Sequence, residues 1–482
     1  MPTAALLIAQ RPAASRILVV GQGAEGRIAE LLAYRPDRLV HLQPDRAAAE
    51  ALERHLPPAL TGVLTDPALD RRFGDPRREL TRIAAGGGRF DLIVLDLGDP
   101  TTAAANRLAT REFVDLCGDL LADDGALATR IGATVNYQGE EVRRYAASAL
   151  LTLGQVFDEV AVIPGETSWL IAGAAGIPSA DPDELARRYR SLAGPLQAVP
   201  AGTFASLVEP RRVAAATASY ASAAEEWGED LLNTDAAPVA YLLQLRVLAH
   251  ASGSALPAAL GAAQRGGAWL VIVPLLVACG VSLRRSLLWP DPEAERRRAG
   301  ALLVGLAGAA AIALQVCLIL SFQVRFGDLF AQVGWLNALF MAGLAAGGLA
   351  GGRWLRGSGL TPPIVFCLAG VGLCLMAGSA IPALQTSIAG SAGPLYYALI
   401  ATGGAVFGAG FPVAGGLVTH RGSSAGAVGA TLEAADHWGA ALGAALVGVA
   451  LVPLLGPART STLLALALAI AAVTIALPPL LR

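Results

Sequence analysis

The stretch that decides the fold is RILVVGQGAEGRIAELLAY, residues 16–34. The apolar run RILVV indicates a buried strand and RIAELLAY a helix, with the glycine turn GQGAEG between them. A GxGxxG turn that follows a strand and opens a helix lets the backbone approach a ligand, and the helix N-terminus favours polar or anionic groups. Gly21, Gly23 and Gly26 are therefore candidate cofactor-binding residues.

The residues after this turn continue the alternation of strand and helix. RLVHL (38–42) indicates a second strand, a loop contains Asp75, and FDLIVLDLGDPTTAAANRLATREF (90–113) begins with a third strand that ends at Asp96. This order predicts a doubly wound α/β domain with its ligand at the carboxyl ends of the strands. An aspartate at such a strand end or Gly-Asp-Pro turn also commonly caps a helix, so a structural role for Asp96 and Asp99 stays open.

Composition divides the chain into two parts. Of 482 residues, 54% are hydrophobic and 15% charged; residues 1–265 carry 25 arginines against 32 acids, and residues 266–482 carry 11 against 6. The first part is therefore predicted to be an acidic water-soluble domain and the second a membrane domain. Within the first, we expect a Rossmann domain over 1–200 and a polar, amphipathic connector over 201–265.

The second part contains apolar runs of the length that a bilayer requires, about 20 residues for each crossing. Small residues four apart, such as Gly343 and Gly347 or Gly439 and Gly443, indicate closely packed helices. The sequence therefore predicts an all-α, multi-pass transmembrane domain of about seven helices over 266–482. The runs span roughly 267–283, 299–321, 332–352, 363–382, 394–418, 435–455 and 461–480.

Three ionisable residues mark the start of the sixth run. Glu433, Asp436 and His437 lie three and four residues apart and so share one helical face. Two interpretations stay open: the three side chains mark an interfacial helix start, or Asp436 and His437 point into the bundle and fix this helix against a neighbour or a partner subunit, near Gln315 or Asn337.

The arginines of the membrane part are unevenly placed. The loop between the first two runs, RRSLLWPDPEAERRR, has five arginines, and the loop after the third adds Arg353 and Arg356, whereas the opposite loops hold little more than Arg325 and Arg459. The positive-inside rule puts the arginine-rich side in the cytoplasm, so we expect the soluble domain on the extracytoplasmic side of the cytoplasmic (inner) membrane. The lack of a secretory signal before the domain opposes this placement.

Several classes of site are excluded or disfavoured. The chain has no lysine, and its five cysteines form no CxxC or CxxCH pair. A Schiff-base lysine and a Walker phosphate loop are thereby excluded, and a metal site, a covalently attached haem and a disulfide framework are not expected. The net acidic soluble domain argues against nucleic-acid binding.

Together these motifs resemble the spermidine synthases, and more closely the membrane-fused branch of that family. VVGQGAEGRIAELL resembles the family's first glycine motif, LVHLQPDRAAAEAL its ribose-binding strand end, LTDPALDRRFGDPRREL its third element, and NTDAAPVAYL (233–242) a stretch that follows the domain. The resemblance implies a methyltransferase-type Rossmann fold that transfers an aminopropyl group from decarboxylated S-adenosylmethionine to a polyamine. It also implies that Asp96 is the general base, that Asp99 holds the amine, and that Asp75 and the position of His41 lie at the nucleoside.

Several positions depart from the family pattern. Ala24 stands where the family has an aspartate, His41 and Gln43 where it has acids near the ribose, and Ala109 where the fused branch has a tyrosine. A neutral imidazole has one acceptor nitrogen and cannot bind two ribose hydroxyls as a carboxylate does. Only MPTAALLIAQRPAAS precedes the first strand, where the family carries a β-hairpin, so we expect one wall of the amine pocket to be missing unless another subunit supplies it.

Two functions follow. The departures favour a non-catalytic scaffold subunit of a membrane complex, a pseudoenzyme whose partners are the lipid bilayer and other membrane or extracytoplasmic subunits. The alternative is a membrane-bound aminopropyltransferase with decarboxylated S-adenosylmethionine as co-substrate. No metal, no nucleic acid and no further cofactor is expected.

Overall fold

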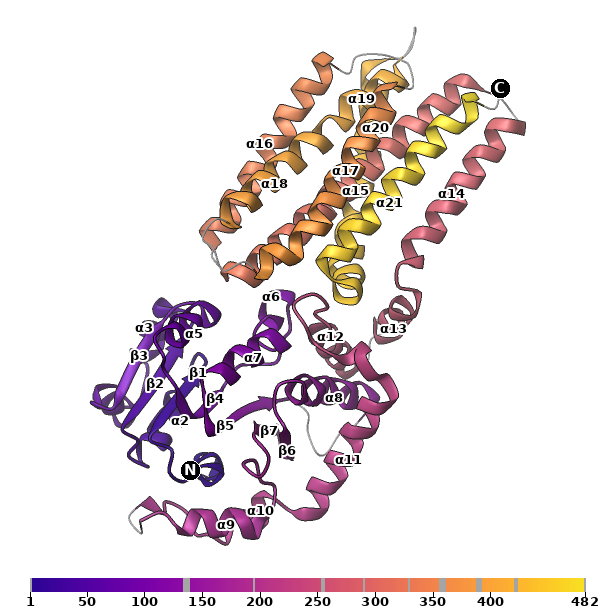
Figure 1. Ribbon diagram of the computed structural model, residues 1–482. Coiled ribbons are helices and arrows are strands. Elements are labelled where there is room, and N and C mark those ends of the chain that lie inside the picture. The colour runs from indigo at the N-terminus through magenta and orange to yellow at the C-terminus, as the bar shows by residue number, and fades with distance from the viewer. Residues whose placement is uncertain are drawn as a thin grey trace. The chain divides into compact units, whose positions relative to one another are not determined.

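The computed structural model describes residues 2–480 except 133–138, 194–195, 253–255, 289–290, 328–329, 355–360, 387–391 and 420–423 (Figure 1). The chain divides into two compact units, Met1–Ala255 and Leu256–Arg482. Most of the predicted connector, 201–265, therefore packs as part of the first unit and does not form a separate linker.

The first unit is built on one seven-stranded sheet in the order β3-β2-β1-β4-β5-β7-β6. The first five strands in sequence pair in parallel, and β7 pairs antiparallel with both β5 and β6. Strand order reverses between β1 and β4, which is the point where open α/β sheets bind ligands. The predicted doubly wound α/β domain is confirmed. Its strands are β1 (Arg16–Val20), β2 (Arg38–Gln43), β3 (Leu69–Phe73), β4 (Phe90–Leu95), β5 (Leu121–Ile131), β6 (Glu159–Ile163) and β7 (Ser168–Gly173).

Helices cover both faces of this sheet, because alternate strand residues point to opposite sides. Ile17 and Val19 of β1 belong to one apolar cluster, and Leu18 and Val20 to the other. The first cluster is covered by α1 (Pro2–Gln10), α2 (Glu25–Leu32), α9 (Pro182–Arg190) and α10 (Thr203–Leu207). The second is covered by α5 (Pro76–Ala85), α7 (Arg111–Asp119), α8 (Glu140–Gly154), α11 (Pro210–Trp227) and α12 (Ala240–Ala251).

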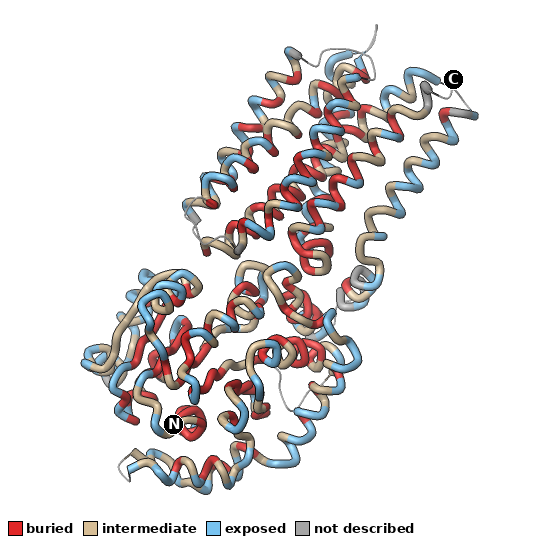
Figure 2. The backbone as a smooth tube through the Cα atoms, viewed as in Figure 1, coloured by how far each residue is buried: buried red, intermediate tan, exposed pale blue. Residues whose placement is uncertain are grey.

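Short elements complete the first unit. They are α3 (Arg46–Glu53), α4 (Pro58–Thr61), α6 (Ala103–Asn106) and the 3-10 turns η1 (Gly62–Thr65) and η3 (Gly228–Leu231). The segment before the first strand forms α1, whose residues from Ala4 to Gln10 are buried (Figure 2). This segment is thus part of the domain core, packed against α9.

The second unit consists of helices. They are α13 (Leu256–Gly266), α14 (Trp269–Leu288), α15 (Pro292–Phe326), α16 (Phe330–Trp354), α17 (Thr361–Thr386), α18 (Ala392–Gly408), α19 (Gly410–Val418), α20 (Ala425–Leu446), the π-helical turn η4 (Val447–Leu451) and α21 (Val452–Leu480). Within the described residues, six helical stretches are long and apolar enough to cross a membrane. One of these, Ala425–Leu477, has 53 residues and is long enough for two crossings. Gly456, with φ 76°, breaks it, so the stretch corresponds to the sixth and seventh predicted runs.

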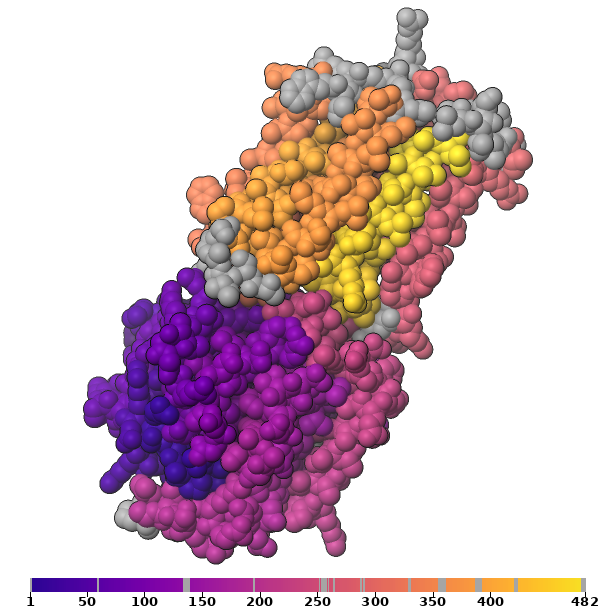
Figure 3. All heavy atoms as spheres, in the orientation of Figure 1, coloured from indigo at the N-terminus to yellow at the C-terminus, as the bar shows by residue number. Residues whose placement is uncertain are grey.

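Small residues let these helices pack closely. A Cβ atom on Gly347 of α16 would overlap the carbonyl oxygen of Ala405 on α18, and one on Gly439 of α20 would overlap the carbonyl oxygen of Gly305 on α15. Helices α17 and α21 also lie in contact (Figure 3). The predicted close packing is present at these positions.

The ionisable residues of α20 do not lie at a helix start, because α20 begins at Ala425, capped by Ser424. Asp436 faces α15, where a Cβ on Gly308 would lie 2.5 Å from its Oδ1. Glu433 and His437 are exposed. Gln315 and Asn337 bond to each other, with 2.7 Å between Gln315 Nε2 and Asn337 Oδ1.

Candidate functional site

The glycine turn and the end of β4 lie against each other at the switch point of the sheet. Gly21 has φ 155°, and a Cβ there would overlap the backbone carbonyl of Asp96. Gly23 has φ 73°, in the left-handed region that favours glycine. Gly26 lies within α2, one residue after its start, and a Cβ would meet no atom within 4 Å. The backbone conformation and its close contacts thus require glycine at positions 21 and 23.

Asp96 is engaged by two arginines. Its Oδ2 accepts from Arg27 Nε of α2 at 2.7 Å, and its Oδ1 accepts from Arg130 Nε of β5 at 2.7 Å. The carboxylate is only 10% exposed, and Arg27 also stacks over Trp169 at 5.0 Å from the ring centroid. A general base must reach the proton it removes with an oxygen lone pair. Both oxygens of Asp96 are already held in this structure.

The end of β2 contains a closed hydrogen-bond chain. His41 Nε2 lies 3.0 Å from the Gly21 carbonyl oxygen, which can only accept, so Nε2 carries the proton. Nδ1 then accepts from Gln43 Nε2 at 3.2 Å. Gln43 Oε1 accepts from Gln22 Nε2 at 3.0 Å, and Gln22 Oε1 accepts from the Asp45 N–H at 3.3 Å.

This chain leaves no ring nitrogen of His41 for a ribose hydroxyl. His41 and Gln43 are both fully buried, and the bonds of the chain join the glycine turn to the end of β2. The geometry favours a structural role for His41, whose assignment as a cofactor-binding residue stays a prediction.

The burial of His41 has a consequence for stability. Desolvation lowers its pKa from the ordinary 6.5 to about 4. Below pH 6.5 the imidazole of His41 therefore takes up a proton in the unfolded chain but stays neutral in the folded domain. The free energy of unfolding falls as the pH drops toward 4. At pH 5 we expect a loss of about 2 kcal/mol relative to pH 7.5, at 1.36 kcal/mol for each unit.

Urea unfolding of the detergent-solubilised chain at pH 7.5 and 5.0 measures this loss. The His41→Gln variant is the matched control, because it removes the imidazole while the carboxylates of the chain titrate as before. The expected outcome is a smaller pH effect in the variant. Equal pH effects in the two proteins would remove His41 as the cause.

Asp75 is also held by protein groups. It caps α5 by accepting from the Arg78 N–H at 3.1 Å, and it forms an ion pair with Arg107. The two side chains of that pair are 8% and 4% exposed. The acid that the resemblance assigned to the adenine thus ties the start of α5 to the loop after β4.

Asp99 lies apart from this network, at a cavity of about 220 Å³. Its Oδ1 accepts from Tyr145 O–H at 2.7 Å and from the Gly132 N–H at 2.9 Å, and Gln244 Nε2 lies 3.5 Å from Oδ2. Burial, and then the charge of Asp99, raises the pKa of Tyr145 well above its ordinary value. Among the described residues Asp96 is not part of the lining, which includes Leu97, Leu108, Ala109, Ser148 and Thr152. The two predicted catalytic acids therefore face different surroundings.

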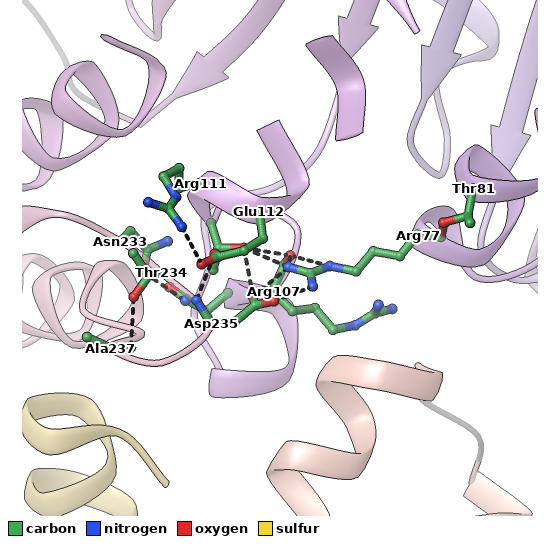
Figure 4. Close-up of polar contacts among 11 residues, drawn as sticks. Arg77, Thr81, Arg107, Arg111, Glu112, Asn233, Thr234, Asp235 and Ala237 are labelled. Atoms are coloured by element: carbon green, nitrogen blue, oxygen red, sulfur yellow. Dashed lines mark hydrogen bonds and ion pairs between the residues drawn. The ribbon is translucent and has the colours of Figure 1, made fainter. Parts of the chain in front are cut away.

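The loop between α6 and α7, residues 107–110, is held by contacts with the stretch NTDAAPVAYL, residues 233–242 (Figure 4). Arg77 of α5 makes a bidentate ion pair with Asp235, at 2.6 and 2.7 Å, and Thr110 Oγ1 donates to Asp235 at 2.8 Å. Asn106 Nδ2 donates to Asn233 Oδ1 at 2.9 Å, and Asn233 Nδ2 donates to the Ala109 carbonyl at 2.9 Å. We call Arg77, Asn106, Thr110, Asn233 and Asp235 the loop clamp.

Sequence reasoning did not assign these clamp residues or the arginines that hold Asp96. Arg27, Arg77 and Arg130 lie far from their partners along the chain, so no local spacing relates them. The one available signal was the polar Asn-Thr-Asp run of 233–235 before an apolar segment. It identifies a polar contact but not its partner.

Comparison with known proteins agrees with this geometry. A glycine turn at the reversal of a seven-stranded, mostly parallel sheet defines a methyltransferase-type Rossmann domain. Residues 5–175 match the spermine/spermidine synthase domain family. The N-terminal unit is a spermidine-synthase-like domain, joined in this chain to helices long and apolar enough to cross a membrane.

Two curated relatives and one solved structure illustrate the similarity. The polyamine aminopropyltransferase of Nitrosomonas europaea is 34% identical over 167 residues, which are 34% of this chain and 49% of the relative. That of Korarchaeum cryptofilum is 29% identical over 114 residues, 24% of this chain and 34% of the relative. The chain thus spans less than half the length of these relatives. The spermidine synthase structure from Thermotoga maritima is 20% identical, covers 44% of this chain and 72% of its own, and has a TM-score of 0.34.

Proposed function

We propose that this protein is a non-catalytic structural subunit of a membrane complex, with a spermidine-synthase-like domain that has lost turnover. The observation that carries the proposal is the closed chain from Gly21 through His41 and Gln43 to Gln22, which uses both ring nitrogens of His41 inside the domain. A ribose needs acceptors for its hydroxyls at a strand end of this kind. Here those acceptors are replaced by a buried structural network.

Asp96 supports the same proposal. Each oxygen of Asp96 already accepts from an arginine, Arg27 or Arg130, and these two positive charges make the carboxylate a weaker base for an amine proton. Asp75 is similarly committed to Arg107. Three of the acids and strand-end residues that the resemblance assigned to chemistry thus hold parts of the domain together.

The alternative function is a membrane-bound aminopropyltransferase. One observation favours it: the cavity beside Asp99 has a carboxylate on its wall and room for a short aliphatic chain. Asp99 is nevertheless bonded to Tyr145 and Gly132, which gives it a structural role as well.

An activity assay separates the two functions. The purified chain, incubated with decarboxylated S-adenosylmethionine and putrescine, is expected to release no methylthioadenosine above the level without protein, as measured by mass spectrometry. An active polyamine aminopropyltransferase is the positive control. Release that depends on putrescine and disappears in the Asp99→Asn variant would establish the enzyme instead.

We further propose that the soluble domain lies on the extracytoplasmic side. The chain enters α14 from the domain, so the loop between α14 and α15 is on the opposite side if α14 crosses the membrane. Arg284, Arg285 and the Arg296–Arg298 run flank that loop. Short loops rich in arginine stay in the cytoplasm.

Cysteine labelling tests this orientation. An impermeant maleimide is expected to label Asp123→Cys, a fully exposed position near the start of β5 in the soluble domain, in cells with an intact cytoplasmic membrane. Glu293→Cys, exposed in the first turn of α15, is expected to react only after the membrane is opened. The reverse pattern would place the domain in the cytoplasm, where adenosylmethionine derivatives are made.

A further inference from the structure

The helical unit contains an apolar groove between four helices, α14, α15, α20 and α21. Its volume is about 410 Å³, and the described residues that line it are all Leu, Val, Pro, Ala or Gly. On α15 the lining runs from Ala301 to Ala313, a length of about 18 Å along the helix axis. The groove is therefore about 5 Å across on average, given that length and a rise of about 1.5 Å for each residue.

The width of this groove restricts what can occupy it. A helix with its side chains is about 10–12 Å across, so a partner helix does not fit. Carbon atoms in contact lie about 3.5–4.0 Å apart, so a single extended hydrocarbon chain fills a channel of this width. Ordered water needs polar partners, and no described side chain of the lining is polar. The groove thus has the shape and chemistry for one acyl chain.

Arginines continue the lining beyond one end of the groove. On α14, Arg285 lies seven residues after the lining residue Ala278 and so shares its face of the helix. On α15, Arg298 lies one turn before the lining residue Leu302, and Arg297 is its neighbour. Because three residues join α14 to α15, these two helix ends lie close together.

Helix length places these arginines at the membrane surface. Helix α15 has 35 residues and is about 52 Å long, whereas the hydrocarbon core of a bilayer is about 30 Å thick. Its apolar run begins at residue 299, directly after Arg298, and Arg285 lies in the last turn of α14. Arg285 and Arg297 are exposed, and Arg298 is half-buried. Since a charge within the core is costly, the three guanidinium groups belong at the level of the lipid headgroups.

The charge at this end of the groove favours an anion. The stretch 284–298 carries five arginines against three acids, and one of these acids, Asp291, caps α15. Glu433 of α20 lies two residues before the lining residue Ala435, about 200° around the helix axis, and so faces away from the groove. Guanidinium groups bind phosphate through paired N–H donors.

We infer that this groove binds one acyl chain of an anionic phospholipid, and that Arg285, Arg297 and Arg298 bind the phosphate of the same molecule. An apolar chain and a charged headgroup on one ligand match the two adjoining parts of the site. The lipid site lies in the helical unit alone, so it goes beyond the proposed scaffold role and stands or falls independently of turnover by the soluble domain.

Native mass spectrometry of the purified full chain in mild detergent tests the site with three probes: dioleoyl phosphatidylglycerol, dioleoyl phosphatidylcholine and glycerol 3-phosphate. The anionic lipid is expected to bind at least about tenfold more tightly than the zwitterionic one, because each arginine near a headgroup adds to the attraction. Glycerol 3-phosphate, which has no acyl chain, is expected not to bind at the same concentrations. Equal affinity for the two lipids, or binding of glycerol 3-phosphate as tight as that of the anionic lipid, would overturn the inference.

Arginine variants test the headgroup position. Arg285→Gln combined with Arg297→Gln and Arg298→Gln is expected to abolish the preference for phosphatidylglycerol. Arg353→Gln is the matched control, because Arg353 is an exposed arginine in the last turn of α16, which does not line the groove in the described residues. A preference retained by the triple variant would remove these arginines from the site.

A filled groove tests the position of the acyl chain. Ala278 lines the groove and is exposed, so Ala278→Phe is expected to occupy the space and weaken binding of phosphatidylglycerol about tenfold. Val277→Phe is the matched control, since Val277 is 58% exposed and lies outside the described lining. Equal affinity of the two phenylalanine variants would contradict a chain in the groove. Thermal unfolding without lipid shows whether each variant is folded, and the comparison of the two lipids on the unaltered chain needs no variant.

Discussion

Replacing Asp235 with alanine is expected to lower the free energy of unfolding of the soluble domain by about 4 kcal/mol. The Asp235 carboxylate makes a bidentate pair with Arg77 and accepts from Thr110, and the two side chains of the pair are 13% and 14% exposed. Its removal leaves a guanidinium with little access to water and no anion. The same change removes the contact of Asp235 with Thr110, while Asn233 keeps its bonds to Asn106 and to the Ala109 carbonyl.

The midpoint of urea unfolding, followed in the solubilised full chain, measures this loss. Arg38→Ala is the matched control, because Arg38 also pairs with an aspartate, Asp70, but is 52% exposed. An exposed pair of this kind contributes about 0–1 kcal/mol. In a double-mutant cycle, Arg77→Ala and Asp235→Ala together are expected to cost little more than either alone. Additive losses would show that the two residues do not act as a pair.

The second large effect concerns Asp96, the residue predicted to be the catalytic base. Asp96→Asn is expected to destabilise the domain by about 3 kcal/mol, because it removes the charge between Arg27 and Arg130 without changing the shape of the side chain. Both arginines retain some exposure, 19% and 38%, which keeps the expected loss at the lower end for a broken buried pair.

The free energy of unfolding of the Asp96→Asn variant distinguishes a structural role of Asp96 from a catalytic one. Active-site groups are commonly held at a cost to stability, so that replacing them leaves the fold equally or more stable. A structural ion pair behaves in the opposite way. Asp124→Asn, whose carboxylate is 57% exposed and pairs with Arg11, is the control and is expected to change little. Unchanged or raised stability of Asp96→Asn would favour the catalytic role.

Much of the fold could be predicted from local sequence. The run 16–34 identified the first strand, turn and helix correctly, because hydrophobic period and glycine placement are local properties. The connector was less predictable: α11 and α12 carry buried residues such as Tyr220 and Leu243 that complete the core, but both helices pack against α8, which lies far from them along the chain. Helix α20 begins ten residues before the predicted run, at Ala425 and not at 435, since glycine and alanine weaken the hydropathy signal there.

The positions of the candidate site residues could be predicted from the sequence, but not whether each side chain is free to bind a ligand. Asp96, Asp99 and Asp75 lie at strand ends or loops of the sheet, as expected. Whether each carboxylate is available depends on Arg27, Arg130 and Arg107, which the fold brings in from other elements. In the same way, the role of His41 depends on Gly21 and Gln43, and a pattern of residue types could not show that both of its nitrogens are engaged.

The most direct test of the proposed loss of the nucleoside site is a calorimetric titration of the purified full chain with decarboxylated S-adenosylmethionine, with methylthioadenosine titrated in parallel. With the end of β2 closed by Gln22, His41 and Gln43, we expect no saturable heat up to about 1 mM ligand, which corresponds to a binding free energy weaker than about −4 kcal/mol. Saturable binding of either compound at micromolar concentration would contradict the account, because it would require an open nucleoside site at that strand end.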